Sequence, residues 1–309
     1  MSKQIAAIVN PVSGRRDLTL AIRKIGRIVT EAGASFTMHR TAGPGDATNL
    51  ASQCRQMADA VLVVGGDGTV CEVVNGLMPQ EVPVLIYRSG TENLLARELN
   101  MPTAPGEVAQ TLLKGRPIPY DVGVFNDRRF LVVAGIGFDA ECVYRMTRRR
   151  TGHITHLDYF WPIWRTFWAH RFPNLRVELD GSPAYEGRGF VILGILPRYS
   201  VGMRILADAA YDDGWLDVCI FPCANRIRLI GHAARSLARR HTHRGDVIYR
   251  RARHVCVTSS ERVHVETDGE HAGFLPAEFG VLTRAARFLV GTGWEGKKKE
   301  NSLTDFDQP

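Results

Sequence analysis

Apolar runs and helix-spaced apolar residues alternate along the first 120 residues of the chain. The run Ile5–Val9 stops at Asn10, and after a turn at Ser13-Gly14 the apolar residues recur three to four positions apart, as on the buried face of a helix. Three further strands are expected at 34–40, 60–64 and 82–87, each followed by a helix. This alternation predicts an α/β domain with a mostly parallel sheet, whose ligands bind beyond the carboxyl ends of the strands.

From Tyr120 onward the pattern changes to short apolar runs separated by Gly, Asp and Pro, which predicts an antiparallel β domain. The runs lie at 122–125, 130–136, 175–179, 189–196, 216–221, 254–258, 262–266, 279–282 and 287–290. Two helical segments are expected near 156–172 and 224–241. The chain therefore divides into a first domain at 1–120 and a second at 121–282, and we expect 296–309 to be a disordered basic and polar tail.

The composition is that of an ordinary globular protein, with 45% hydrophobic and 23% charged residues. A net charge of +7 predicts an anionic partner, which is a nucleic acid, a membrane or a phosphorylated small molecule. The first 120 residues hold twelve basic and ten acidic side chains, whereas Arg226–Arg253 holds nine arginines and one acid, Asp246. No nucleic-acid recognition motif accompanies these arginines, so we do not expect nucleic acid as the partner.

The six cysteines show no C-x-x-C pair and no spacing to histidine that would indicate zinc, so we expect reduced thiols. Neither a signal-peptide core nor an apolar stretch of about 18 residues, as a membrane span needs, is present. These features predict a cytoplasmic protein that is soluble or peripherally attached to a membrane.

A glycine-rich loop, Gly65-Gly66-Asp67-Gly68-Thr69, directly follows a buried strand and opens a helix. Glycines let backbone N–H groups approach an anion, the helix N-terminus adds a favourable dipole, and Asp67 can hold a phosphate-bound Mg²⁺. A glycine-rich turn without a ligand is the alternative. Polar residues at the other strand ends favour the phosphate site: Asn10, Thr41, Thr91 and Asn93.

Six motifs occur together in this chain. They are N-P-V-S-G-R at 10–15, G-G-D-G-T-V-x-E-V-V-N-G-L at 65–77, G-T-E-N-L-L-A at 90–96, G-I-G-F-D-A at 135–140, D-D-G-W-L-D-V at 212–218 and D-G-E at 268–270. In this order they resemble the diacylglycerol kinase catalytic-domain family of lipid kinases, which includes soluble bacterial lipid kinases and the sphingosine and ceramide kinases. The G-G-D-G-T element alone is shared with NAD kinases and phosphofructokinases.

The resemblance implies a nucleotide-binding α/β domain of the NAD kinase and diacylglycerol kinase type, followed by an antiparallel β-sandwich domain that takes the lipid. The segment 283–295 is expected to return to the first domain. The residues that fall at the family's ATP site are Asn10, Thr41, Gly65, Gly66, Asp67, Gly68, Thr69, Val70, Cys71, Thr91 and Asn93.

The resemblance also implies catalytic and metal-binding residues. Glu270 matches the family's proposed general base, and Asp67 would serve the Mg²⁺ that spreads the charge of the transferring phosphate. Asp213, with the main chain of Ala210 and Trp215, matches a structural Mg²⁺ site of some bacterial members, and Asp121 would join its network.

Several of these assignments have plainer alternatives. Asp268-Gly269-Glu270 is also a strong hairpin-turn signal, and Asp212-Asp213-Gly214 is also a common solvated turn. The chain departs from the family pattern at Cys71, at Arg88-Ser89 and at Val132. Arg88 is either a cation beside the phosphates or a surface residue at the end of a strand.

Residues 156–172 hold three of the five tryptophans. At helical spacing one face carries Phe160, Trp161, Trp164, Phe167 and Trp168, and Pro162 marks the start or a kink of the helix. Together with Arg165, His170 and Arg171, these aromatic residues suit a membrane interface or an acyl-chain cleft. Packing of the helix on the core of the second domain is the alternative.

The helix expected near 224–241 carries part of the arginine-rich segment. Its apolar residues Ile227, Leu229, Ile230, Ala234 and Leu237 are expected to pack inward, while Arg228, Arg235, Arg239 and Arg240 face outward. Beside a lipid substrate these arginines would attract anionic headgroups, and a solvated basic helix is the alternative.

The motifs lead to one main hypothesis, an ATP- and Mg²⁺-dependent lipid kinase. It would phosphorylate a hydroxyl of a diacylglycerol-like or long-chain-base lipid at a membrane surface, with anionic phospholipid as a further partner; homodimer formation is left open. A kinase of a soluble substrate that shares the G-G-D-G-T loop is one alternative. A non-catalytic nucleotide- or lipid-binding protein is the other.

Overall fold

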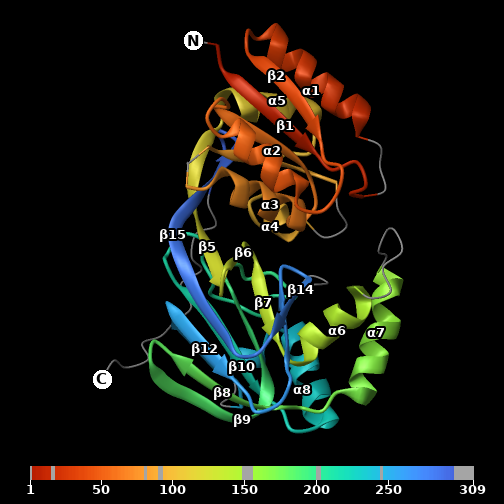
Figure 1. Ribbon diagram of the computed structural model, residues 1–309, viewed down its shortest axis with the longest axis vertical. Coiled ribbons are helices and arrows are strands. Elements are labelled where there is room, and N and C mark those ends of the chain that lie inside the picture. The colour runs from red at the N-terminus through yellow and green to blue at the C-terminus, as the bar shows by residue number, and fades with distance from the viewer. Residues whose placement is uncertain are drawn as a thin grey trace.

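The computed structural model describes residues 2–14, 18–79, 82–89, 93–147, 156–199, 203–243 and 246–295. Two domains lie end to end along the long axis of the molecule (Figure 1). The N-terminal domain forms the upper half of this view and the β-rich domain the lower half. Thr91 and the expected tail at 296–309 lie outside the described residues.

The first domain is an α/β domain with a parallel sheet. Its elements are β1 (Gln4–Val9), α1 (Thr19–Glu31), β2 (Ser35–Arg40), α2 (Asp46–Cys54), β3 (Ala60–Gly65), α3 (Asp67–Leu77), β4 (Val84–Arg88), α4 (Leu94–Glu98) and α5 (Pro105–Lys114). The strand order is β2-β1-β3-β4, and all three pairings are parallel. The central strand β3 is buried along its whole length, as the uninterrupted apolar run at 60–64 predicts.

The second domain is an antiparallel β-sandwich with helices at one side (Figure 1). Its elements are β5 (Arg116–Phe125), β6 (Arg128–Phe130), β7 (Val133–Ile136), α6 (Phe138–Thr147), α7 (His156–Ala169), β8 (Asn174–Leu179), β9 (Ser182–Gly194), β10 (Leu216–Pro222), α8 (Arg226–Leu237), a 3₁₀ turn (His241–His243), β11 (Ile248–Ala252), β12 (His254–Thr258), β13 (His264–Thr267), β14 (Glu270–Phe274) and β15 (Ala277–Val290). The long strand β9 joins the two layers, because it pairs with β8 in one and with β7 and β10 in the other. The predicted fold class is thus confirmed.

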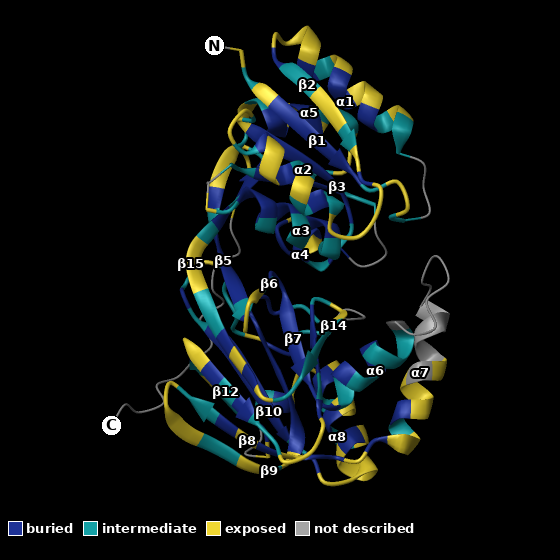
Figure 2. Ribbon diagram, viewed as in Figure 1, coloured by how far each residue is buried: buried dark blue, intermediate teal, exposed yellow. Residues whose placement is uncertain are grey.

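The strand β15 connects the two domains. It pairs antiparallel with β12 and β5, and near its end it pairs parallel with β4 of the first domain, with Phe288 opposite Val84. One cluster of buried hydrophobic side chains includes residues of both halves of the molecule, and Figure 2 shows β5 largely buried where it enters the second domain. An ion pair between Arg198 and the buried carboxylate of Glu98, 2.6 Å long, adds a polar link between the domains.

Some elements differ from the sequence predictions. The expected runs at 279–282 and 287–290 form one strand, interrupted by a bulge at which Arg284 has a φ of 53°. The helix α6 was not predicted, because its residues follow the apolar run of β7 without a turn signal other than Gly137. All six cysteines are free thiols.

The orientation of α8 contradicts the prediction. Of the five apolar residues expected to face inward only Leu229 is buried, whereas Ile227 is 82% exposed, Ile230 57% and Leu237 66%. Ala234 is exposed as well. The inner face carries His232 and Ser236 instead, since the His232 ring packs against Phe221 and its Nε2 hydrogen-bonds to the Pro222 carbonyl at 3.0 Å. The inner face of α8 is thus occupied by a hydrogen-bonded histidine, where the pattern predicted aliphatic side chains.

Candidate active site

A cleft of about 340 Å³ lies between the two domains, and both of them line it. The first domain contributes the N-terminal part of α3, including Gly68 and Cys71. The second contributes the turn between β13 and β14, including Asp268 and Glu270. Motifs that are about 200 residues apart in the chain therefore meet at one place, beside the N-terminal part of α3.

Glu270 lies directly against the first turn of α3. A Cβ atom built on Gly68 would be 3.2 Å from Glu270 Oε1, so the absence of a side chain at Gly68 makes room for this carboxylate. The helix α3 begins after Gly66, and no side chain caps its N-terminus. Uncapped N–H groups at the start of a helix favour a phosphate, so the arrangement puts a carboxylate beside a candidate phosphate site.

Asp268 holds the turn that carries Glu270. Its carboxylate accepts hydrogen bonds from three successive backbone N–H groups, those of Leu131 at 2.7 Å, Val132 at 2.8 Å and Val133 at 3.1 Å. Asp268 itself has a φ of 50°. Burial raises the pKa of the Asp268 carboxyl to about 7, although the three hydrogen bonds act in the opposite direction. The D-G-E sequence is therefore both a hairpin turn and a fixed support for Glu270.

A second carboxyl, that of Glu266, supports the turn at 268–270. Glu266, only 1% exposed, accepts the Gly269 N–H at 2.8 Å through Oε2 and lies beside Asp139, to which the Tyr199 hydroxyl donates a hydrogen bond. Burial raises the pKa of Glu266 well above its usual range, and it also raises the pKa of Asp139. Sequence reasoning did not identify this pair, although Asp139 belongs to the G-I-G-F-D-A motif.

The loops after β1 and β3 are joined by Asn10. Its Nδ2 donates to Thr69 Oγ1 at 3.0 Å, and its Oδ1 accepts the Val12 N–H at 3.1 Å. Gly14 is packed so closely on the loop after β4 that a Cβ would lie 1.6 Å from the Ser89 carbonyl oxygen. The strand ends therefore form one connected edge, which is the edge where nucleotide binding is predicted.

Asn93 and Thr41 complete this edge within the described residues. Asn93 has a left-handed backbone with a φ of 46°, and its Nδ2 donates to the Gly65 carbonyl at 2.9 Å. Its Oδ1 is buried, and no described group donates to it. Thr41 is buried, and its N–H donates to the Val9 carbonyl at 2.9 Å.

Asp67, Val70 and Cys71 have contacts in the structure that were not predicted from the sequence. The Asp67 carboxylate accepts the N–H groups of Leu94 at 2.9 Å and Leu95 at 3.3 Å, so it caps α4 and fixes that helix to the glycine loop. The Val70 side chain is fully buried, which leaves only its backbone for a ligand. Cys71 faces the cleft, and burial raises the pKa of its thiol.

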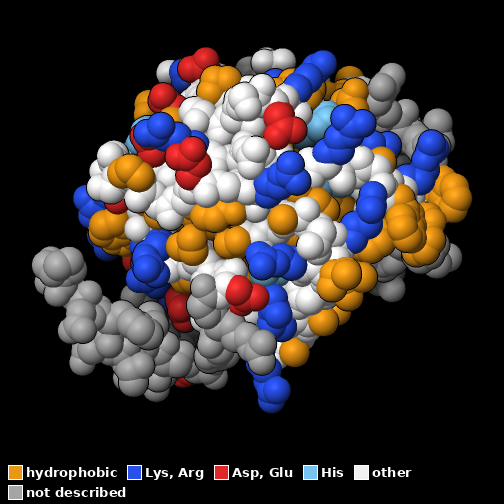
Figure 3. Space-filling model, turned by 90° about the horizontal axis from the view of Figure 1, so that it is seen from below, with side chains coloured by type: hydrophobic (Ala, Val, Ile, Leu, Met, Phe, Trp, Pro, Cys, Tyr) orange, Lys and Arg blue, Asp and Glu red, His pale blue; other side chains and the backbone are white. Residues whose placement is uncertain are grey.

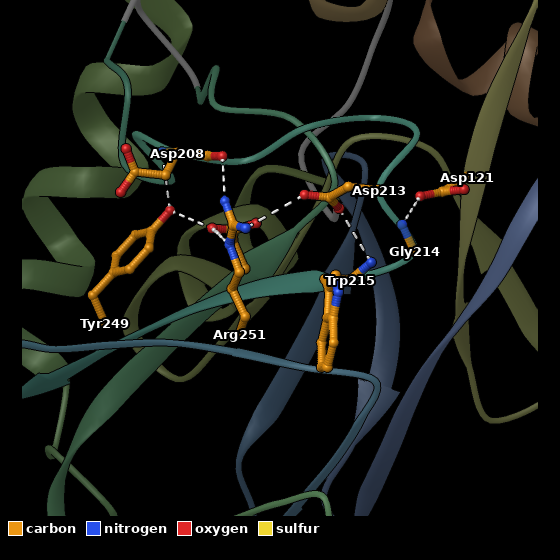
Figure 4. A network of polar contacts seen from close by, with 8 residues as sticks. Asp121, Asp208, Asp213, Gly214, Trp215, Tyr249 and Arg251 are labelled. Atoms are coloured by element: carbon orange, nitrogen blue, oxygen red, sulfur yellow. Dashed lines mark hydrogen bonds and ion pairs between the residues drawn. The ribbon is translucent and has the colours of Figure 1, made fainter. Parts of the chain in front are cut away.

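Figure 4 shows the polar network around Asp213. Asp213 Oδ1 accepts the Trp215 N–H at 3.2 Å, while no described group hydrogen-bonds to Oδ2. Arg251 Nη1 lies 3.5 Å from this Oδ2, and Arg251 also donates to the Asp208 carbonyl at 2.9 Å. The oxygen is available to a cation, yet a guanidinium already balances its charge.

Two buried aspartates surround this network. Asp121 accepts the Gly214 N–H at 2.6 Å (Figure 4) and the Arg284 N–H at 2.7 Å, so it joins the Asp213 loop to the bulge of β15. Asp217 accepts the Tyr249 hydroxyl at 2.6 Å, and burial raises its pKa to about 6. Among the described residues no group of three or more His, Cys, Asp or Glu is placed to hold a metal. The structural Mg²⁺ at Asp213 stays a prediction.

Comparisons with protein families match both domains. Residues 4–125 match the diacylglycerol kinase catalytic domain, and residues 132–290 match the YegS C-terminal NAD kinase beta sandwich-like domain. The chain is 32% identical over 308 residues to a diacylglycerol kinase of Bacillus subtilis (strain 168), which covers 98% of this chain and 100% of that one. A diacylglycerol kinase of Staphylococcus carnosus (strain TM300) is 29% identical over 284 residues, or 90% of this chain and 92% of its own.

Solved structures agree with the fold. A putative diacylglycerol kinase from Bacillus anthracis str. Sterne superposes with a TM-score of 0.75 at 26% identity and covers 95% of this chain and 99% of its own. A second crystal structure from the same organism also gives a TM-score of 0.75, at 23% identity. The arrangement of an α/β domain on a β-sandwich is therefore shared.

Proposed function

Because this chain belongs to the diacylglycerol kinase catalytic-domain family, a family of lipid kinases, we propose that it transfers the γ-phosphate of ATP to a lipid hydroxyl at a membrane surface. The substrate class would be a diacylglycerol-like or long-chain-base lipid. The observation that carries the proposal is the contact of Glu270 with the first turn of α3 at Gly68, which would put a proton acceptor beside a phosphate-binding helix end.

The first domain would bind ATP at the edge formed by the loops after β1 to β4. Backbone N–H groups of the glycine loop and of the first turn of α3 would hold the phosphates. Asn10 and Asp67 would keep this edge rigid, since they bind Thr69 and the start of α4. Mg²⁺, entering with ATP, would supply charge stabilisation for the transferring group.

Glu270 would accept the proton of the attacking hydroxyl. It is exposed to the cleft, and it is held by the turn that Asp268 and Glu266 anchor, so it needs little movement to reach a hydroxyl placed near Gly68. Phosphoryl transfer depends mostly on position and charge, and a fixed carboxylate next to the phosphate site supplies both for the acceptor.

The test is turnover of labelled ATP with a total lipid extract, followed by identification of the phosphorylated product. Glu270→Gln should lower kcat by a factor of about 100 or more, because general-base catalysis contributes that much. ATP binding should stay at the wild-type level. Glu278→Gln, in which the side chain is 70% exposed on β15, is the control and should keep wild-type turnover.

Wild-type turnover in purified Glu270→Gln would refute the assignment of the base. A wild-type protein that binds ATP and phosphorylates no lipid would refute the proposed activity. Phosphorylation of a water-soluble extract without lipid would favour a soluble substrate instead.

A further inference from the structure

Two helices of the second domain expose an unusual number of large apolar side chains. On α7, Trp161 is 52% exposed, Trp164 46% and Trp168 54%. On α8, Ile227, Ile230 and Leu237 are exposed by 82%, 57% and 66%. We call these six side chains the α7–α8 face. Within the described residues no other pair of neighbouring helices exposes as many large apolar side chains.

The six side chains form stripes along their helices. Trp161, Trp164 and Trp168 are spaced three and four residues apart, so they lie on one side of α7. Ile227, Ile230 and Leu237 lie on one side of α8, opposite to the buried side that carries His232 and Ser236. An apolar stripe that points away from the core of its own domain indicates a surface that meets something else.

Arg226 joins the two helices into one surface. Its guanidinium donates to the carbonyls of Phe167 at 2.9 Å and of Trp168, at the end of α7. It also lies 5.4 Å from the centre of the Trp168 ring, within the range of a cation–π contact. The end of α7 is therefore fixed against the start of α8, and the two apolar stripes are neighbours.

Cations surround the apolar side chains. Arg165 and Arg171 are exposed on α7 and just after it, and Arg228, Arg239 and Arg240 are exposed on α8 and just after it. Asp246, on the loop that follows, is paired with Arg235 at 2.8 Å. Figure 3 shows this end of the molecule, where orange and blue side chains lie intermixed on the side of α7 and α8. Such a surface is complementary to an anionic one.

We propose that the α7–α8 face docks the enzyme on an anionic lipid bilayer. This inference rests on the proposed function, because a lipid kinase has to reach its substrate in a membrane. Tryptophans are favourable at the level of the headgroups, aliphatic side chains insert just below it, and arginines bind the lipid phosphates. A second copy of the chain is a poorer occupant, because it would bring arginines against arginines.

The position of the face suits delivery of a lipid to Glu270. The helix α7 packs on α6, and α6 packs on β13 and β14, the strands on either side of the turn that carries Glu270. No helix in the described part of the chain is long and apolar enough to cross a membrane.

The experiment is co-sedimentation of the full chain with vesicles of phosphatidylcholine alone and with 30% phosphatidylglycerol, a composition chosen as about typical of an anionic membrane. Wild type should bind the anionic vesicles, and binding should weaken as salt rises. Arg228→Gln/Arg240→Gln and Trp164→Ala/Trp168→Ala should each bind at least about tenfold more weakly. The tryptophan emission of wild type should shift to the blue on binding.

Matched controls lie at the opposite end of the molecule. Leu20 is 77% exposed and Met57 70%, so Leu20→Ser/Met57→Ser removes comparable apolar surface. Arg23→Gln/Lys24→Gln removes two exposed cations from α1. Both control variants should bind vesicles as wild type does.

The outcomes separate this inference from the proposed function. Equal binding of all variants, or no wild-type binding to anionic vesicles, overturns the docking face, even if lipid in detergent micelles is phosphorylated. Vesicle binding that depends on the face, without phosphorylation of any lipid, supports the docking face and overturns the kinase proposal. A dimer in sedimentation velocity that only the face variants lose would assign the face to a second copy and overturn membrane docking.

Discussion

Asp268→Asn tests whether the turn at 268–270, which carries Glu270, is supported by a carboxyl that burial keeps partly protonated. The folded-state pKa of Asp268 is about 7 instead of the usual 3.8. Because the raised pKa belongs to the folded state, that state binds a proton which the unfolded state has already lost between about pH 4 and pH 7. The free energy of unfolding therefore falls as pH rises through this window, and the loss is complete above it.

The size of the effect follows from the two pKa values. A difference from 3.8 to about 7 corresponds to about 4 kcal/mol at 1.36 kcal/mol per pKa unit. Asp268 is half-buried, and solvent screening reduces the expected value to ~2 kcal/mol. Asparagine cannot ionise, so the variant lacks this loss. It also presents an NH₂ group to one of the three N–H donors, which lowers its stability at every pH by about 1 kcal/mol.

The assay is urea unfolding of wild type and Asp268→Asn at pH 4, 5, 6, 7 and 8. The difference in unfolding free energy should move in favour of the variant by ~2 kcal/mol from the lowest to the highest pH. Taking the difference cancels other groups whose pKa values are raised, such as Asp217 at about 6. Glu186→Gln, an exposed change on β9, should show no such movement. A difference between Asp268→Asn and wild type that is constant with pH would refute the reasoning.

Two further predictions concern the cleft and the metal. Gly68→Ala should lower kcat at least about tenfold, because the new methyl group displaces Glu270, and it should change the free energy of unfolding by less than about 1 kcal/mol. The control is Gly106→Ala, which is also at the second position of a helix but has open space around it, and it should leave kcat unchanged. Steady-state kinetics and thermal unfolding check both variants. If Mg²⁺ binds at Asp213, it should raise the melting temperature of wild type but not of Asp213→Asn. The control variant Asp212→Asn should respond to Mg²⁺ as wild type does. A melting temperature of wild type that neither Mg²⁺ nor EDTA changes would contradict the site.

The first domain was predictable from the sequence because its apolar pattern and its turn residues agree. The run at 60–64 is uninterrupted, and a strand buried on both sides requires this. Gly65-Gly66-Asp67 directly follows it, and in the structure α3 begins at Asp67. Local sequence and tertiary position specify the same element there, so little beyond the pattern was needed.

The side chains that support the turn carrying Glu270 could not be predicted in the same way. Asp268 binds backbone groups about 135 residues earlier, and Glu266 lies beside Asp139 from another element. Their contacts depend on the pairing of β13 with β7, which no local pattern specifies. The one local signal is Gly135, where a Cβ would lie 2.4 Å from Asp139 Oδ2. A glycine inside an apolar strand thus marked the place where a side chain approaches the backbone.

The orientation of α8 was predicted wrongly for the same reason, since no local pattern specifies which elements the helix packs against. Ile227, Ile230 and Leu237 lie on one side of α8, but periodicity does not say whether an apolar stripe meets the core or another surface. His232 settles the orientation, because its ring packs on Phe221 and its nitrogen has a partner inside. Once the inner face is filled, exposing the apolar stripe to water has no benefit for folding. The proposed contact with a bilayer surface, which is apolar and anionic at once, would cover both this stripe and the arginines around it.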